Sequence, residues 1–142
     1  MLRRPLLYRE AVPAYLSDDW LAAMDAAIKD HQGLAAATSD TSLVIQNVIT
    51  GGPGGQVAYA IRLDHGRGDI NAGNEPAADV TFTTDIDTAR AIHRGDESAQ
   101  TAFMAGRLRI GGDARVLIAN QHVLAELDDV FASVRAAEVA DA

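Results

Sequence analysis

Four histidines and two closely spaced aspartates are the side chains best suited to metal binding or acid–base chemistry. The histidines fall in different predicted elements, at positions His31, His65, His93 and His122. No pair of them has metal-ligand spacing with a carboxylate. Asp85 and Asp87 are candidates for paired acid–base work, but they sit at a predicted helix start, where capping is the commoner role. We therefore expect no metal ion and no catalytic residues.

Nucleophile and phosphate-binding motifs are also missing from the sequence. The chain has no cysteine, which removes thiol nucleophiles, disulfides and cysteine metal sites. No serine lies in a Gly-x-Ser-x-Gly elbow. The glycine-rich stretch GGPGG at 51–55 precedes a strand and lacks a following Lys-Ser/Thr, so it predicts a turn and not a phosphate loop. We expect no cofactor and no enzymatic activity.

Composition limits the partners. The 142 residues suit one domain, and the formal net charge of −8 repels phosphate backbones. Nucleic acid is therefore not expected as a partner, and contact with anionic membranes should be transient at most. Pro5 and Glu10 interrupt any signal-like apolar core near the N-terminus. We expect a soluble cytoplasmic protein.

The first half of the chain predicts one helix and four strands. Ser17 is placed to cap a helix over 18–31, with Gly33 as its stop. Alternating and β-branched residues then predict strands at 42–50, 56–64, 68–73 and 78–84. Their short connectors predict antiparallel neighbours.

The second half switches to helical periodicity. It predicts two short helices, a strand and a long helix, at 85–95, 96–106, 107–112 and 115–137. Helices segregated on an antiparallel-rich sheet make an α+β domain. We expect an N-terminal arm at 1–16, a single domain at 17–137 and a frayed tail at 138–142.

Three segments, in this order and spacing, give a family resemblance. They are YLSDDWLAAMDAAI at 15–28, ADVTFTTD at 78–85 and AQTAFMAGRLRIGGD at 99–113. Together they resemble the sterol carrier protein type two family of lipid-binding domains. The resemblance implies a five-stranded, mostly antiparallel sheet covered by helices, with an apolar tunnel between sheet and helices. It also implies non-enzymatic carriage of an elongated hydrophobic ligand: a fatty acid, an acyl-CoA or a sterol-like lipid.

The apolar residues expected to line the tunnel come from the strands and the helices that face them. They are Tyr59, Ile61, Phe82, Phe103, Met104, Leu108, Ile110, Leu117, Leu124 and Leu127. Phe103 and Met104 are expected to face the sheet from a helix end, as core or as tunnel wall. A buried Tyr59 hydroxyl needs a partner, which is a backbone carbonyl or a ligand carboxylate. The last helix is expected to act as the lid.

Two other function classes stay open. An enzyme on the same fold would need ionisable groups with perturbed pKa values in the cavity, for which Tyr59, His93 and Asp113 are the candidates. A homodimeric interaction module would use the apolar arm at 1–16 to dock on a second copy.

Overall fold

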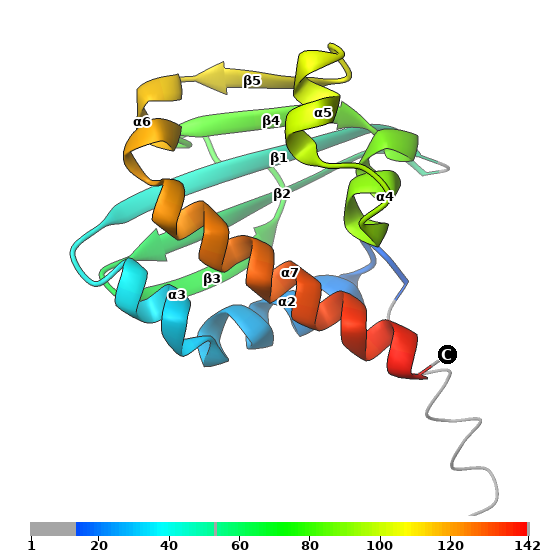
Figure 1. Ribbon diagram of the computed structural model, residues 1–142. Coiled ribbons are helices and arrows are strands. Elements are labelled where there is room, and N and C mark those ends of the chain that lie inside the picture. Colours follow the sequence, from blue (N-terminus) through cyan, green and yellow to red (C-terminus); the bar gives the residue numbers. More distant parts are fainter. Residues whose placement is uncertain (1–13, 53, 142) are drawn as a thin grey trace, which may run out of the picture.

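The computed structural model describes residues 14–52 and 54–141, arranged as a sheet with helices on one side (Figure 1). The helices are α2 (Asp18–Asp30), α3 (Gln32–Ala37), α4 (Ile86–Arg94), α5 (Ala99–Met104), α6 (Ala114–Ala119) and α7 (Gln121–Asp141). The strands are β1 (Ser42–Gly52), β2 (Gly55–Asp64), β3 (Arg67–Ala72), β4 (Val80–Asp85) and β5 (Leu108–Gly112). The α+β class with five strands is confirmed.

The sheet is mixed but mostly antiparallel. Its order is β3-β2-β1-β4-β5, and β1 and β4 pair in parallel while the other neighbours are antiparallel. The prediction that all consecutive strands are antiparallel neighbours is therefore wrong at β4. The connector 73–79 runs from the end of β3 past β2 and β1. Strand β4 therefore pairs with the edge of β1 that β2 does not occupy.

Gln46 and Asp79 hold this connector against the sheet. The Gln46 side chain is buried, and its amide donates to the carbonyls of Tyr59 and Gly73 at 3.2 and 3.1 Å. Its oxygen accepts from the Glu75 N–H at 2.5 Å. Asp79 accepts from the Val44 N–H at 2.7 Å, next to the start of β4. These hydrogen bonds fix the connector to β1, which lies far from it in the sequence. The pattern of neighbouring residues does not reveal such a contact.

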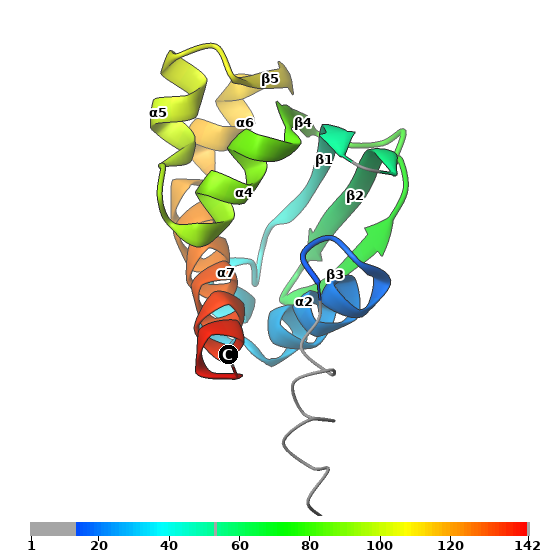
Figure 2. The same cartoon turned by 90° about the vertical axis from the view of Figure 1, so that its right-hand side faces the viewer.

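Alternation along the strands separates two faces of the sheet. Strand pairing puts Ile45, Asn47 and Ile49 of β1 on one face, with Tyr59 and Phe82 opposite Asn47 on the two neighbouring strands. Ile45, Ile49 and Tyr59 on this inner face are buried. Figure 2 shows α4, α5 and α7 on one side of the sheet, with α2 near β3. The inner face is the one that these helices cover.

The predicted helix at 18–31 is confirmed as α2, and the predicted Ser17 cap accepts from the Trp20 N–H at 3.1 Å. Its expected stop at Gly33 is wrong, because His31 adopts an extended backbone and ends the helix. The His31 side chain then accepts from the Leu34 N–H at 2.9 Å and begins α3. Gly33 lies inside α3, where a Cβ would displace the Glu126 carboxylate of α7.

The predicted single helix over 115–137 is two helices, α6 and α7. Asn120 has a non-helical backbone, and its side-chain amide donates to the Val116 carbonyl at 2.8 Å. Its own carbonyl accepts from the Val123 and Leu124 N–H groups, so one asparagine closes α6 and opens α7. The redirected α7 runs back across α2, α3 and α4 (Figure 1).

Residues 1–13 of the predicted N-terminal arm lie outside the described residues. Residues 138–141, assigned from the sequence to a frayed tail, belong to α7. In the described part of the chain, no helix combines the length and apolarity needed to span a membrane.

Candidate functional site

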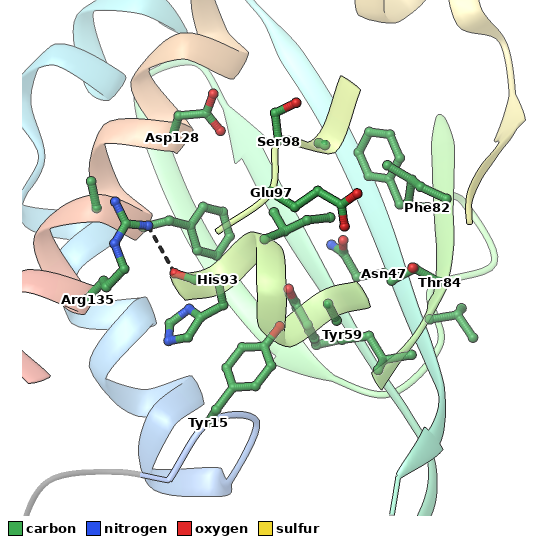
Figure 3. A pocket seen from close by; sticks show the side chains of 18 of the residues that line it. Tyr15, Asn47, Tyr59, Phe82, Thr84, His93, Glu97, Ser98, Asp128 and Arg135 are labelled. Carbon is green, nitrogen blue, oxygen red and sulfur yellow. Dashed lines mark hydrogen bonds between the residues drawn. The ribbon is translucent and has the colours of Figure 1, made fainter. Parts of the chain in front are cut away.

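A pocket of about 680 Å³ lies between the inner face of the sheet and helices α4, α5 and α7 (Figure 3). Strands β1, β2, β4 and β5 form its floor, and α7 forms the facing wall. Tyr15, which precedes α2, also lines it. A volume of this size falls in the range of about 300–1,000 Å³ that is typical of small-molecule sites.

Small side chains on the helices leave this space open. The apolar lining is Val48, Ile49, Phe82, Ala89, Ile92, Ala99, Leu108, Ala125, Phe131 and Ala132. The helices contribute four alanines to it. Because an alanine reaches little beyond the helix backbone, the helices cover the sheet without filling the volume beneath them.

An aromatic cluster supports one side of the pocket. Tyr15 stacks on His93 with ring centroids 4.3 Å apart, and both residues line the pocket. Trp20 packs edge-on against Tyr15 at 5.0 Å and against Tyr59 at 5.8 Å. Trp20 is fully buried, and its indole N–H has no hydrogen-bond partner among the described residues. The cluster connects α2 to the pocket floor by ring packing.

Most charged groups of the pocket are engaged by protein partners. Glu97 is ion-paired with Arg107, whose hydrogen bonds hold the pKa of the Glu97 carboxyl below its usual range. Asp129 contacts His31 Nε2 at 2.7 Å. The Arg135 guanidinium donates to the His93 carbonyl at 3.0 Å, at the end of α4. These pairs join the segment before α5 to the residue before β5, the N-cap of α3 to α7, and the end of α4 to α7.

Asp128 differs from the other charged groups of the pocket. Among the described residues its carboxylate has no ion pair or hydrogen bond, and partial withdrawal from water raises its pKa. It lies on the pocket side of α7 (Figure 3). The pocket thus contains one carboxylate that no neighbouring cation among the described residues compensates.

Two uncharged polar side chains, Asn47 and Tyr59, lie on the pocket floor. They are directly opposite residues of the β1–β2 pair, and both line the pocket. Tyr59 is only 4% exposed, and this burial raises the pKa of its hydroxyl far above the usual value, so the group stays protonated. No hydrogen bond to either side chain forms within the described part of the chain, and the neighbouring Tyr15 adds to the rise in the pKa of Tyr59.

The residues that the sequence proposed as tunnel lining are distributed over several environments. Tyr59, Phe82 and Leu108 line the pocket. Ile61 and Leu127 are buried in the core, and Ile110, Leu117 and Leu124 are partly buried outside the pocket lining.

Phe103 and Met104 do not face the sheet, contrary to the sequence expectation. They are 50% and 78% exposed. Ser98 caps α5 by accepting from the Thr101 N–H at 3.0 Å, so the helix begins at Ala99. This starting point directs Ala102 inward as the buried residue of the helix. The following two side chains then point to solvent.

Of the three ionisable candidates, Tyr59 and His93 line the pocket and Asp113 does not. Asp113 instead caps α6, where it accepts from the Arg115 N–H at 3.0 Å. Asp85 caps α4 by accepting from the Thr88 N–H at 2.9 Å. The described residues contain no group of three or more side chains suited to hold a metal ion.

Sequence reasoning missed Asn47, Glu97, Ser98, Asp128 and Arg135 as pocket residues. A signal existed for Asn47 alone, because strict alternation with Ile45 and Ile49 places it on the inner face. The other four depend on how the helices sit over the sheet.

Comparison with known proteins agrees with this architecture. Residues 22–125 match the SCP-2 sterol transfer family. A search of curated protein sequences gave no match. Similar solved structures include the conserved hypothetical protein TT1886 of Thermus thermophilus, with a TM-score of 0.71 and 21% identity over 85% of this chain and 90% of that chain.

Two further structures share the fold. The crystal structure of a sterol carrier protein 2 has a TM-score of 0.71 and 21% identity, covering 86% of this chain and 98% of its own. The apo form of sterol carrier protein 2 from Yarrowia lipolytica has a TM-score of 0.60 and 18% identity, covering 88% and 98%. The family match spans the whole sheet and reaches from within α2 to the first part of α7. The chain therefore belongs to the SCP-2 sterol transfer family.

Proposed function

We propose that this protein binds and carries an elongated hydrophobic ligand in the pocket beneath α4, α5 and α7. The observation that carries the proposal is the pocket of about 680 Å³ between the inner face of the sheet and alanine-bearing helix faces. Membership of the SCP-2 sterol transfer family supports the same function. The ligand class is a fatty acid, an acyl-CoA or a sterol-like lipid, lying in a tunnel that continues the pocket.

Apolar burial is sufficient to drive such binding. Each methylene removed from water contributes roughly 0.8 kcal/mol. About sixteen methylenes would give about 13 kcal/mol, from which association subtracts several. Contacts with Phe82, Leu108 and Phe131 and with hydrogen-bonding groups restore part of that loss. Affinity in the micromolar range therefore requires no catalytic group and no cofactor.

The proposed setting is a non-enzymatic carrier in the cytoplasm. The net charge of −8 favours brief encounters with anionic membranes over stable docking and disfavours nucleic acid. A homodimer formed through the arm at 1–16 would be compatible with carriage, because α7 forms the pocket wall that faces the sheet.

Organic extraction of freshly purified protein, followed by mass spectrometry, tests the proposal. We expect an apolar compound in near-stoichiometric amount. The matched control is a folded variant with the pocket filled, Ala132→Trp, which should yield much less. Equal yields from both proteins would mean that the compound adheres elsewhere.

An enzyme acting on an apolar metabolite is the second candidate. Asp128 and Tyr59 both line the pocket, and burial shifts both pKa values upward. Such shifts occur at acid–base sites. The measurement is consumption of the extracted compound over time. Turnover that Asp128→Asn abolishes would favour the enzyme, and recovery of unchanged compound would favour the carrier.

A further inference from the structure

We propose that Asn47 and Tyr59 form an uncharged hydrogen-bonding subsite on the pocket floor, which receives an alcohol, ketone or ester oxygen of the apolar ligand. The inference rests on the proposed carrier function and adds a head-group preference to it: neutral oxygen over carboxylate.

The two side chains are brought together by strand register. Asn47 pairs with Tyr59 across β1 and β2, and Phe82 lies opposite Asn47 on β4. Opposite side chains on one face of a sheet are about 5 Å apart at Cβ. Ile45 and Ile49 flank Asn47 on the same face. The polar pair is therefore enclosed by apolar residues and is fixed on strands and not on a loop.

Both side chains line the pocket without a hydrogen bond to the described residues. Tyr59 is 4% exposed and Asn47 is half-buried. Neither polar end is fully enclosed, since the Trp20 indole N–H is the one fully enclosed side-chain group that lacks a partner in the described part of the chain. Both ends are therefore available to whatever fills the pocket, and a ligand oxygen that accepts from both would satisfy them once the ligand excludes water. Figure 3 shows both side chains at the pocket.

The charges around the subsite disfavour an anionic head group. Asn47 and Tyr59 carry no charge, and the same lining adds the Asp128 carboxylate, which has no ion pair among the described residues. The one arginine among the described lining residues, Arg135, donates to the His93 carbonyl. A carboxylate bound at the subsite would therefore meet two neutral side chains and not a guanidinium.

The experiment uses displacement of Nile red, an uncharged apolar dye, from the full-length protein at about pH 8, where fatty acids are ionised. The competitors are dodecanol, methyl dodecanoate and dodecanoate, which share one chain length. We expect the alcohol and the ester to bind at least about tenfold more tightly than dodecanoate. Asn47→Leu and Tyr59→Phe should each weaken dodecanol about three- to tenfold relative to Nile red, whose affinity is measured separately for each variant. Asn74→Leu, at an exposed position of the connector between β3 and β4, is the matched control.

Several results would overturn the subsite. One is that dodecanoate binds as tightly as dodecanol. If Arg135→Gln then abolished the binding of dodecanoate, the carboxylate head group would lie at Arg135. Another is unchanged dodecanol affinity in both floor variants. A third is a lower melting temperature for ligand-free Asn47→Leu and Tyr59→Phe, because removal of unpartnered polar groups should leave stability equal or higher. In all three cases Nile red still binds, so the carrier function stands. Failure of the folded protein to bind Nile red or any competitor would overturn the carrier function and the subsite together.

Discussion

The rings of Trp20 and Tyr59 meet edge to face, with centroids 5.8 Å apart and planes at 73°. Trp20 belongs to α2 and is fully buried, whereas Tyr59 belongs to β2 and lines the pocket. A ligand that contacts Tyr59 on the pocket floor would therefore be separated from the indole by a single ring. Trp20 is the single tryptophan of the chain, so its fluorescence reports on this region alone.

The first prediction is that ligand binding changes the Trp20 fluorescence. An alcohol on the pocket floor alters the surroundings of Tyr59, and through it those of Trp20. We expect a saturable change in emission during titration with dodecanol, with the same midpoint as Nile red displacement. Displacement without any change at Trp20 would place the ligand away from Tyr59.

The second prediction concerns Gln46, which anchors the connector between β3 and β4. Gln46→Leu should lower the free energy of unfolding by about 2–4 kcal/mol, because four backbone groups lose a hydrogen-bond partner. Gln56→Leu, at an exposed position of β2, should change it by less than about 0.5 kcal/mol. Urea unfolding measures both. Equal effects would mean that burial of the connector, and not Gln46, holds β4 beside β1.

The third prediction concerns Gly112 at the end of β5. Its φ is +88°, and an added Cβ would lie 2.5 Å from the Asp79 carbonyl oxygen. Gly112→Ala should therefore cost about 2–4 kcal/mol of unfolding free energy, from left-handed backbone strain and the clash. Gly54→Ala is the control, because no atom lies within 4 Å of its Cβ position. A neutral result at Gly112 would mean that β5 shifts freely against β4.

The fourth prediction is a pH-dependent gain from Asp128→Asn. Desolvation raises the pKa of Asp128 in the folded state, so the ionised carboxylate opposes folding above its unfolded pKa of about 3.9. Removing the charge should stabilise the protein at neutral pH. Because the residue is exposed, solvent screening keeps this gain below about 1 kcal/mol.

Melting temperatures of wild type and Asp128→Asn between about pH 3 and pH 7 test this sign. The gain should shrink as the pH falls and vanish once Asp128 is protonated in both states. Asp129→Asn is the contrasting variant, since it removes the contact with His31 at 2.7 Å and should not stabilise. A gain that is constant over the pH range would exclude titration of Asp128 as its cause.

Much of the fold was predictable because the patterns that specify it are local. Alternation in residues 56–64 and 78–84, and the Ser17 cap, are properties of neighbouring residues. The parallel pairing of β4 with β1 was not predictable in this way, since it depends on Gln46 bonding to residues far along the chain. Asn120, a residue type that often ends helices, is the one sequence signal for the division of α6 from α7. The apolar stripe continues through this position and therefore predicts a single helix.

The pocket was harder to predict than the sheet. Alternation along the strands predicts that Phe82, Tyr59 and Leu108 face the pocket. It does not apply to Phe103 and Met104, because the Ser98 cap decides where α5 begins and therefore which of its side chains face the sheet. The space itself comes from helix alanines that line the pocket. In the sequence these look like ordinary helix formers, and only the packing of the helices shows what they leave open.

The central claim is that the pocket beneath α7 binds an apolar ligand. Saturable binding of Nile red, compared among wild type, Ala132→Trp and Ala136→Trp, tests it most directly. Ala132 lines the pocket, and Ala136 is an exposed residue one turn further along the same helix. We predict one-to-one binding by wild type and Ala136→Trp, and at least about a tenfold loss of affinity in folded Ala132→Trp. Equal binding by all three folded proteins, or binding by none, would contradict the claim.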